Sequence, residues 1–195
     1  MTATTLPSKN KYASIQLAEW VVIVVTVAAL LAGWLLKNSV ENRSVPFEAS
    51  GISAQTPQGW LMTSLQGNEI LQVTDPLSSG FGTTYIIENI PVASDASVGN
   101  VVSLLTLQRG QALTAYRVLE QKHVTVFGRA AYEINFVYVE SNPNLTHNDI
   151  PNIVRGLDYI FLNGDHAILA TYWADEKAFD SDLGRFQRFL GSLQF

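Results

Sequence analysis

The sequence predicts an α+β fold: an antiparallel sheet covered by two helices, preceded by one transmembrane helix. Three observations predict it. A charge-free run of seventeen residues lies near the amino terminus, at 20–36. Short alternating segments between turn residues fill most of the later chain, which is typical of strands. Two stretches with apolar residues at helical spacing interrupt and close that series.

The charge-free run 20–36 predicts a membrane anchor. As a helix it would be roughly 26 Å long, close to the thickness of a bilayer's hydrocarbon core. Trp20 and Trp34 would then lie in the two membrane interfaces, and Lys37 would follow at the surface. The lipid bilayer is therefore the expected partner of this run.

A cleaved signal peptide is the alternative for this region, because lysines precede the apolar run. The run is longer than the core of a usual signal peptide, and it meets Lys37 where a small-residue cleavage site would stand. An uncleaved single-pass anchor fits better. Two lysines before the run and Lys37 and Arg43 after it leave the orientation open. A short leading tail favours an extracytoplasmic domain, whether periplasmic, lumenal or at the cell surface.

The chain divides into four segments. We expect a flexible tail at 1–12, the anchor helix at 13–38, a linker at 39–50 and one α+β domain at 51–195. Pro46 would end any helix that continued into the linker. A domain of about 150 residues can bury a core without disulfides, which suits the absence of cysteine.

The domain is acidic. From Val45 onward the chain holds eight lysines and arginines against fifteen aspartates and glutamates. Such a surface repels phosphate backbones and anionic lipid headgroups, so we expect no nucleic acid partner. Basic or neutral protein surfaces, or cations, are the partners that this charge favours.

The first half of the domain predicts strands and then a helix. Four alternating segments, 52–56, 60–65, 70–74 and 83–89, are separated by Pro57-Gln58-Gly59, Gly67-Asn68, Asp75-Pro76 and Gly80-Phe81-Gly82. Apolar residues then recur at helical spacing over 97–116, after Ser94-Asp95, which can cap a helix.

The second half predicts more strands and a closing helix. Strands are expected at 117–121, 123–127, 130–140, 154–162 and 166–174. Asn163-Gly164 joins the last two and favours a two-residue hairpin turn. The closing helix carries one apolar face, with acidic residues in its first turns. With the helices packed on one sheet face, these elements would form an α+β sandwich.

The order of elements and the turns resemble the PsbP/Mog1-like fold. Pro57-Gln58-Gly59-Trp60 stands where that family has an early P-x-G-W turn, and 126–132 is similar to its central hairpin. The end of the chain, 189–195, is similar to its closing helix and strand-like tail, although Leu193 stands where phenylalanine is usual. The resemblance covers about residues 50–195 and consists of turns and packing positions. It therefore implies a fold, and no metal or partner motif carries over.

Few residues favour catalysis or metal binding. The sequence has no cysteine and no G-x-S-x-G motif, and its glycine-rich stretch 78–84 lacks the lysine of a phosphate-binding loop. His147 and Asp149 share an H-x-D spacing, but two ligands do not make a metal site. We expect no enzyme activity, no cofactor and no bound metal.

The loop 141–153 is the predicted partner-binding segment. It is polar, holds two prolines and is longer than a hairpin needs, which is common for disordered or binding loops. His147, Asp149 and Arg155 are the candidate partner-binding side chains, because charged and imidazole groups can set the register with a partner. A solvated connection is the alternative.

Together these features predict a non-catalytic, membrane-anchored accessory or assembly subunit of a larger membrane protein complex. It would act through protein–protein contacts, and its tether would raise the domain's effective concentration beside the partner. The alternative function is a tethered small-ligand or cation-binding module. Such a module would use the cleft between helix and sheet, with loops near Gly82 and His147 as its rim.

Overall fold

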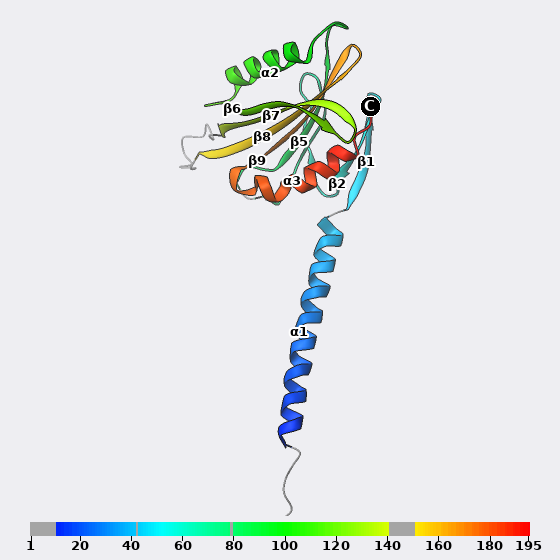
Figure 1. Ribbon diagram of the computed structural model, residues 1–195, viewed down its shortest axis with the longest axis vertical. Coiled ribbons are helices and arrows are strands. Elements are labelled where there is room, and N and C mark those ends of the chain that lie inside the picture. Colours follow the sequence, from blue (N-terminus) through cyan, green and yellow to red (C-terminus); the bar gives the residue numbers. More distant parts are fainter. Residues whose placement is uncertain (1–10, 42, 79, 141–150) are drawn as a thin grey trace, which may run out of the picture. The chain divides into compact units, whose positions relative to one another are not determined.

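The computed structural model describes residues 11–41, 43–78, 80–140 and 151–195 (Figure 1). The chain divides into two compact units, Met1–Arg43 and Ser44–Phe195. The first unit contains helix α1, Lys11–Glu41. Within α1 the window Trp20–Lys37 has a mean hydropathy of 2.2 and is long and apolar enough to cross a membrane. None of that window is buried within the structure.

The second unit is an α+β domain, which confirms the predicted fold class. Its elements are β1 (Ser44–Ala49), β2 (Ile52–Pro57), β3 (Leu61–Met62), β4 (Glu69–Thr74), β5 (Thr84–Pro91), α2 (Val98–Ala112), β6 (Arg117–Val126), β7 (Arg129–Glu140), β8 (Asn152–Asn163), β9 (His166–Asp175) and α3 (Glu176–Gly191). Strands β3 to β9 form one antiparallel sheet in the order β3-β4-β5-β9-β8-β7-β6. Strands β1 and β2 form a separate hairpin.

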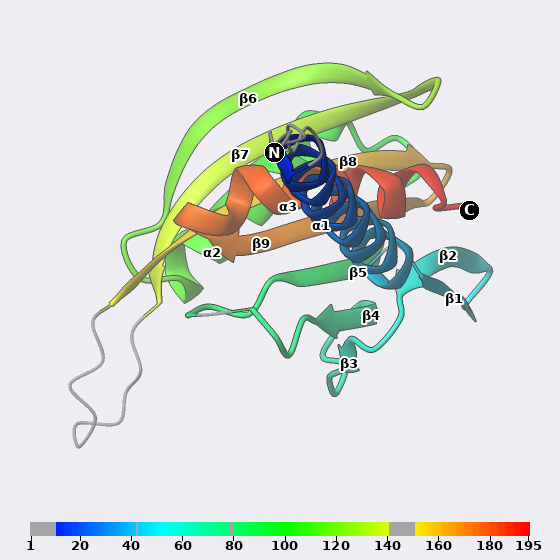
Figure 2. The same ribbon diagram turned by 90° about the horizontal axis from the view of Figure 1, so that it is seen from below.

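Helices α2 and α3 cover opposite faces of the sheet, and not one face as the sequence analysis expects (Figure 2). Val101, Val102 and Leu105 of α2 pack on one face, whereas Phe179 and Phe186 of α3 pack on the other. The reason lies in the central strands β8 and β9. Both strands are buried at nearly every position along their middle. Each face of these strands is therefore packed against a helix.

Strand β1 lies within the stretch 39–50 that the sequence analysis assigns to a linker. It pairs with β2, and Phe47 opposite Ala54 packs on the core beneath α3. The turn between these strands has positive φ at Ser50 (52°) and Gly51 (77°). Ser-Gly is a weaker hairpin signal than Asn-Gly, and Pro46 is tolerated because β1 is an edge strand. Pairing with β2 therefore makes this stretch a strand.

The hairpin predicted at Asn163-Gly164 is present, with its turn one residue later. Asn163 pairs with His166, so Gly164 and Asp165 form the turn, and only Gly164 has positive φ (65°). This suits a turn with glycine at its first central position. The predicted strands 117–121 and 123–127 are one strand, β6, with a bulge between Val118 and Glu120.

Candidate functional site

Helix α2 carries a buried arginine. The helix begins after Ser97, whose side chain accepts a hydrogen bond from the backbone N–H of Asn100 at 3.3 Å. Helical spacing from Leu105 then places Arg109 on the face turned to the sheet. The Arg109 side chain is only 9% exposed. A guanidinium at this depth needs partners on the sheet.

Arg109 has two polar partners on the central strands. Its Nη1 forms an ion pair with Asp158 Oδ2 on β8, and its Nη2 donates to Thr171 Oγ1 on β9 at 3.1 Å. Thr171 donates in turn to Asp158 Oδ1 at 2.8 Å. Asp158 and Thr171 face each other in the β8–β9 ladder, and both are 0% exposed. The three side chains form a closed network that links α2 to the sheet.

Aromatic rings complete the surroundings of the guanidinium. Its carbon lies 4.7 Å from the ring centroid of Phe136 and 5.7 Å from that of Trp173. The Phe136 ring lies over Gly156, its partner in the β7–β8 ladder. A Cβ at Gly156 would overlap the ring carbons. Gly156 therefore leaves the space in which the ring supports Arg109.

Within the network the positive charge of Arg109 compensates the negative charge of Asp158. Burial raises the pKa of the Asp158 carboxyl, while the Arg109 guanidinium and the Thr171 hydroxyl act against that rise. Removing one partner of such a pair would leave a buried charge uncompensated. Because all three polar side chains are engaged with one another, the network positions α2 and offers no free group for chemistry.

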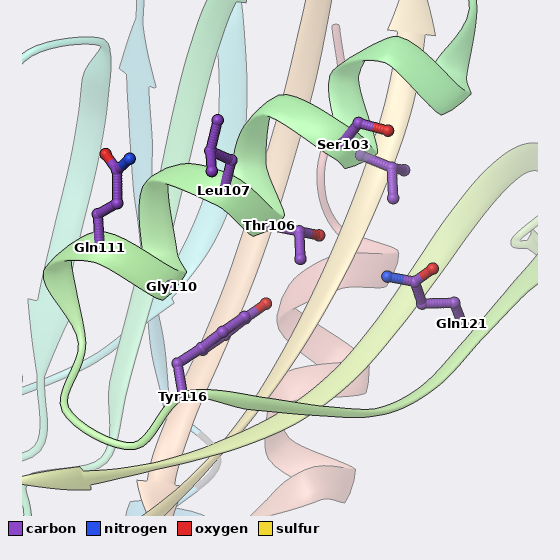
Figure 3. A pocket seen from close by; sticks show the side chains of 8 residues that line it. Ser103, Thr106, Leu107, Gly110, Gln111, Tyr116 and Gln121 are labelled. Atoms are coloured by element: carbon purple, nitrogen blue, oxygen red, sulfur yellow. The ribbon is translucent and has the colours of Figure 1, made fainter.

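A wide pocket lies between α2 and β6 (Figure 3). Its volume is about 620 Å³, and it is lined by Val102, Ser103, Thr106, Leu107, Gly110, Gln111, Tyr116 and Gln121. Figure 3 shows Tyr116 and Gln121 turned toward Thr106. The hydroxyl oxygens of Thr106 and Tyr116 are both buried. Burial also raises the pKa of Tyr116. The lining offers hydroxyl and amide groups and no charged side chain.

A second pocket lies between α2 and β5. Its volume is about 410 Å³, and its lining is Asn68, Glu88, Ile90, Pro91, Val92, Ala93, Ala96, Asn100, Val101, Leu104, Leu105 and Gln108. Glu88 is the ionisable member of this set. The rest are amides and apolar side chains, so this pocket combines one carboxylate with an apolar wall.

The predicted partner-binding residues are only partly described. His147 and Asp149 lie outside the described residues. Arg155 lies on β8, where its guanidinium carbon is 4.2 Å from the ring centroid of Phe179. It also donates to Asp180 Oδ1 and Asn135 Oδ1, both at 3.4 Å. These contacts belong to the α3 side of the sheet, so the structure does not bring Arg155 to the pockets beside α2.

The predicted membrane-interface residues lie on α1. Trp20 and Trp34 are 67% and 61% exposed, and Lys37 is exposed as well. Their role at the membrane stays a prediction. Among the residues that the structure describes, no group of three or more His, Asp or Glu side chains could hold a metal ion.

The buried network and Glu88 were not predicted from the sequence. Two signals were present. Asp158 interrupts the apolar strand 154–162, and a charged residue inside a central strand needs a buried partner. Arg109 follows Leu105 by four residues, on the face of the helix that holds the valines of the core.

Comparison with known proteins identifies the class of fold. No family model and no curated protein matches the sequence. Solved structures do match, and they place the domain in the PsbP/Mog1-like class, as the resemblance of its turns predicts. Cyanobacterial PsbP (CyanoP) from Synechocystis is similar, with a TM-score of 0.59 and 12% identity over 78% of this chain and 92% of that one.

Two further structures are similar over a comparable share of the chain. A Pseudomonas aeruginosa protein of unknown function gives a TM-score of 0.51 at 11% identity, over 79% of this chain and 98% of that one. The Ran-binding protein Mog1p of Saccharomyces cerevisiae gives 0.49 at 10% identity, over 77% and 94%. The conclusion about the fold rests on the cyanobacterial structure. Identities this low establish a fold and no function.

Proposed function

We propose that this protein is a non-catalytic, membrane-anchored accessory or assembly subunit of a larger membrane protein complex. The observation that carries the proposal is a set of three exposed apolar side chains at one edge of the sheet. Leu61 and Met62 on the terminal strand β3 are 60% and 63% exposed, and Leu65 just after it is 51% exposed. Because β3 is a terminal strand, its free edge can pair with another chain, and these exposed side chains would be covered by such a partner.

Two other features support the proposal. Helix α1 is long and apolar enough to cross a membrane, and as an anchor it would hold the domain beside a membrane-embedded partner. Such a tether raises the local concentration of the domain, so that a small interface can give stable association. The buried polar side chains of the α2 network bind one another, which leaves none of these three free for catalysis.

The interface is tested by purification of the complex in mild detergent from the native host. We expect the triple variant Leu61→Ser, Met62→Ser, Leu65→Ser to lose the comigrating membrane proteins. Leu119→Ser is the matched control, because Leu119 is also an exposed leucine (52%) but lies on β6, the opposite edge strand. Equal melting temperatures for both variants would exclude unfolding as the cause. An unchanged set of partners in the triple variant would reject this edge as the interface.

The candidate residues of the loop 141–153 and the adjoining Arg155 form a separate part of the proposal. We expect alanine replacement of His147, Asp149 and Arg155 together to weaken association with the complex. Because Arg155 packs on Phe179 within the domain, Arg155→Ala is also measured alone for stability. Full association of the triple variant would remove this loop from the interface.

The orientation in the membrane is a separate part of the proposal, based on the short tail before the apolar run. We propose that α1 crosses the bilayer once through 20–36, with Trp20, Trp34 and Lys37 at the interfaces and the domain on the extracytoplasmic side. A protease added to intact right-side-out vesicles should then digest the domain. Digestion that requires an opened membrane would place the domain and its partner in the cytoplasm.

A tethered small-ligand module is the second candidate function. The two pockets beside α2 favour it, because they provide concave surfaces with mixed polar and apolar linings. The ligand-binding module and the accessory subunit can be distinguished by measurement, since a ligand-binding module would bind its ligand as a purified protein without any partner.

A further inference from the structure

Glu88 lines the pocket on the β5 side of α2 without a polar partner. It lies opposite Leu169 in the β5–β9 ladder, on the sheet face that packs against α2. Among the described residues, its carboxylate makes no hydrogen bond and no ion pair. A carboxylate in a partly enclosed site loses hydration, and without a partner it recovers little of that loss.

The charges around Glu88 are unbalanced. Arg109 is the nearby cation, and it already pairs with Asp158. Glu69 lies opposite Glu88 in the β4–β5 ladder and adds a third carboxylate. Burial raises the pKa of Glu88, Arg109 acts against the rise, and the charges of Asp158 and Glu69 add to it. One guanidinium cannot neutralise three carboxylates, so a bound cation would relieve the excess negative charge.

The pocket wall indicates what kind of cation fits. Ile90, Val92, Leu104 and Leu105 form apolar surface, and the amides of Asn68, Asn100 and Gln108 are also in the lining. A metal ion would need several oxygen or nitrogen ligands around it, and the described residues hold no such acidic or histidine group. An ammonium group with an apolar body can instead meet the carboxylate and the leucines at once.

We propose that this pocket binds a small organic ammonium compound, with its charged group on Glu88 and its apolar body against Leu104 and Leu105. The volume of about 410 Å³ is in the range of small-molecule sites. This inference deepens the ligand-binding candidate and does not depend on the accessory role. The pocket beside β6 has no charged side chain in its lining, so it would not share this preference.

The test uses the full chain in non-ionic detergent, with cyclohexylammonium as the probe. We expect saturable shifts of the Leu104 and Leu105 methyl signals in nuclear magnetic resonance spectra at neutral pH. Cyclohexanol, which has the same ring and no charge, should bind much more weakly. Equal binding of the two compounds would overturn the proposal, because the pocket would then recognise only the ring. The absence of saturable shifts would overturn it as well.

Variants test the role of the carboxylate. Glu88→Gln should weaken cyclohexylammonium binding about tenfold or more, since it removes a charge-assisted hydrogen bond. Glu48→Gln on β1 is the control, because it changes the net charge equally at an exposed site that is not part of the pocket lining. Equal affinity of the two variants would overturn the assignment to Glu88.

The pH dependence gives a second readout. Binding to the wild-type protein should weaken as the pH falls and Glu88 takes up a proton in competition with the ammonium group. Arg109, Asp158 and Glu69 are the charged neighbours that set where this occurs. Binding to Glu88→Gln should change much less with pH. Comigration with membrane partners should be unaffected by Glu88→Gln, so failure of this inference and failure of the accessory role are distinguishable.

Discussion

At the residue scale, Arg109 illustrates how a buried charge is held. Its desolvation is offset by Asp158, by the Thr171 hydroxyl and by the rings of Phe136 and Trp173. A buried ion pair contributes little net stability compared with apolar residues of similar volume, but the loss of one partner is costly. The pair therefore fixes how α2 lies on the sheet more than it stabilises the fold.

We expect Arg109→Met to lower the free energy of unfolding by about 3–5 kcal/mol, because Asp158 would stay buried without its cation. The double variant Arg109→Met, Asp158→Leu should recover most of that loss, since no charge remains in the core. Urea unfolding of the variants measures both effects. Arg117→Met, at an exposed position of β6, is the control and should change the free energy by no more than about 0.5 kcal/mol. A double variant that is less stable than Arg109→Met alone would contradict the energetic coupling between Arg109 and Asp158.

Glu88 should make stability depend on pH. Its pKa in the folded domain is raised above the ordinary value of 4.5, chiefly by burial. The folded state then holds the proton at pH values where the unfolded state has released it, so stability falls as the pH rises through the folded pKa. We expect the stability of wild type relative to Glu88→Gln to fall as the pH rises from 4.5 toward neutral. A difference that stays constant across urea titrations in this range would contradict the expectation.

At the scale of elements, β8 is the strand that organises the domain. It lies between β7 and β9, and its side chains reach both cores. Gly156 within it leaves room for the Phe136 ring, on which the Arg109 guanidinium rests. A strand position without a side chain is thus used here for close ring packing.

Gly156→Ala should destabilise the domain by about 1–3 kcal/mol or more, because the new methyl group overlaps the Phe136 ring. Gly184→Ala in α3 is the matched control. A Cβ at Gly184 meets no atom within 4 Å, so this change should be neutral or stabilise by up to about 1 kcal/mol. Melting curves of both variants check the pair. A neutral Gly156→Ala would show that the ring can move without loss.

At the scale of the whole molecule, the hairpin β1–β2 belongs to the domain. Ser53 and Gln194 exchange two backbone hydrogen bonds of 3.0 and 2.9 Å, and the backbone N–H of Gln55 donates to Ser192 Oγ at 2.8 Å. Phe47 and Ile52 pack on the core beneath α3. The hairpin therefore joins the first strands of this unit to its last residues.

A fragment that starts at Ser44 should fold alone and unfold in one cooperative step, because it contains the complete second unit. A fragment that starts at Gly51 lacks β1, so it should unfold at a lower urea concentration. Circular dichroism during urea titration compares the two. Equal midpoints would mean that β1 adds nothing to the stability of the domain.

Most of the fold was predictable because its signals are local. The turn glycines, the alternation of the strands and the apolar face of α3 are properties of neighbouring residues. The face on which α2 packs was missed, because it depends on the burial of both faces of β8 and β9, which is set by strands distant in sequence. Strand β1 was missed because Pro46 and the polar run 41–44 before it are typical of a linker.

The candidate site was less predictable than the fold. Arg109, Asp158 and Thr171 come from three elements and meet only after the sheet is assembled. The surroundings of Glu88 could not be predicted for the same reason, since its charged neighbours lie on β4, α2 and β8. The loop residues His147 and Asp149 remain a prediction from sequence alone.

The order of strands also bears on how the chain folds during synthesis. Strands β3 to β5 form one series of neighbours and β6 to β9 another, and the two meet only where β5 pairs with β9, with Tyr85 opposite Tyr172. As the ribosome releases β5, its apolar edge has no partner until almost the entire chain has emerged. An unpaired apolar strand is a site of aggregation and of chaperone contact. The nascent chain is therefore most vulnerable between the synthesis of β5 and that of β9.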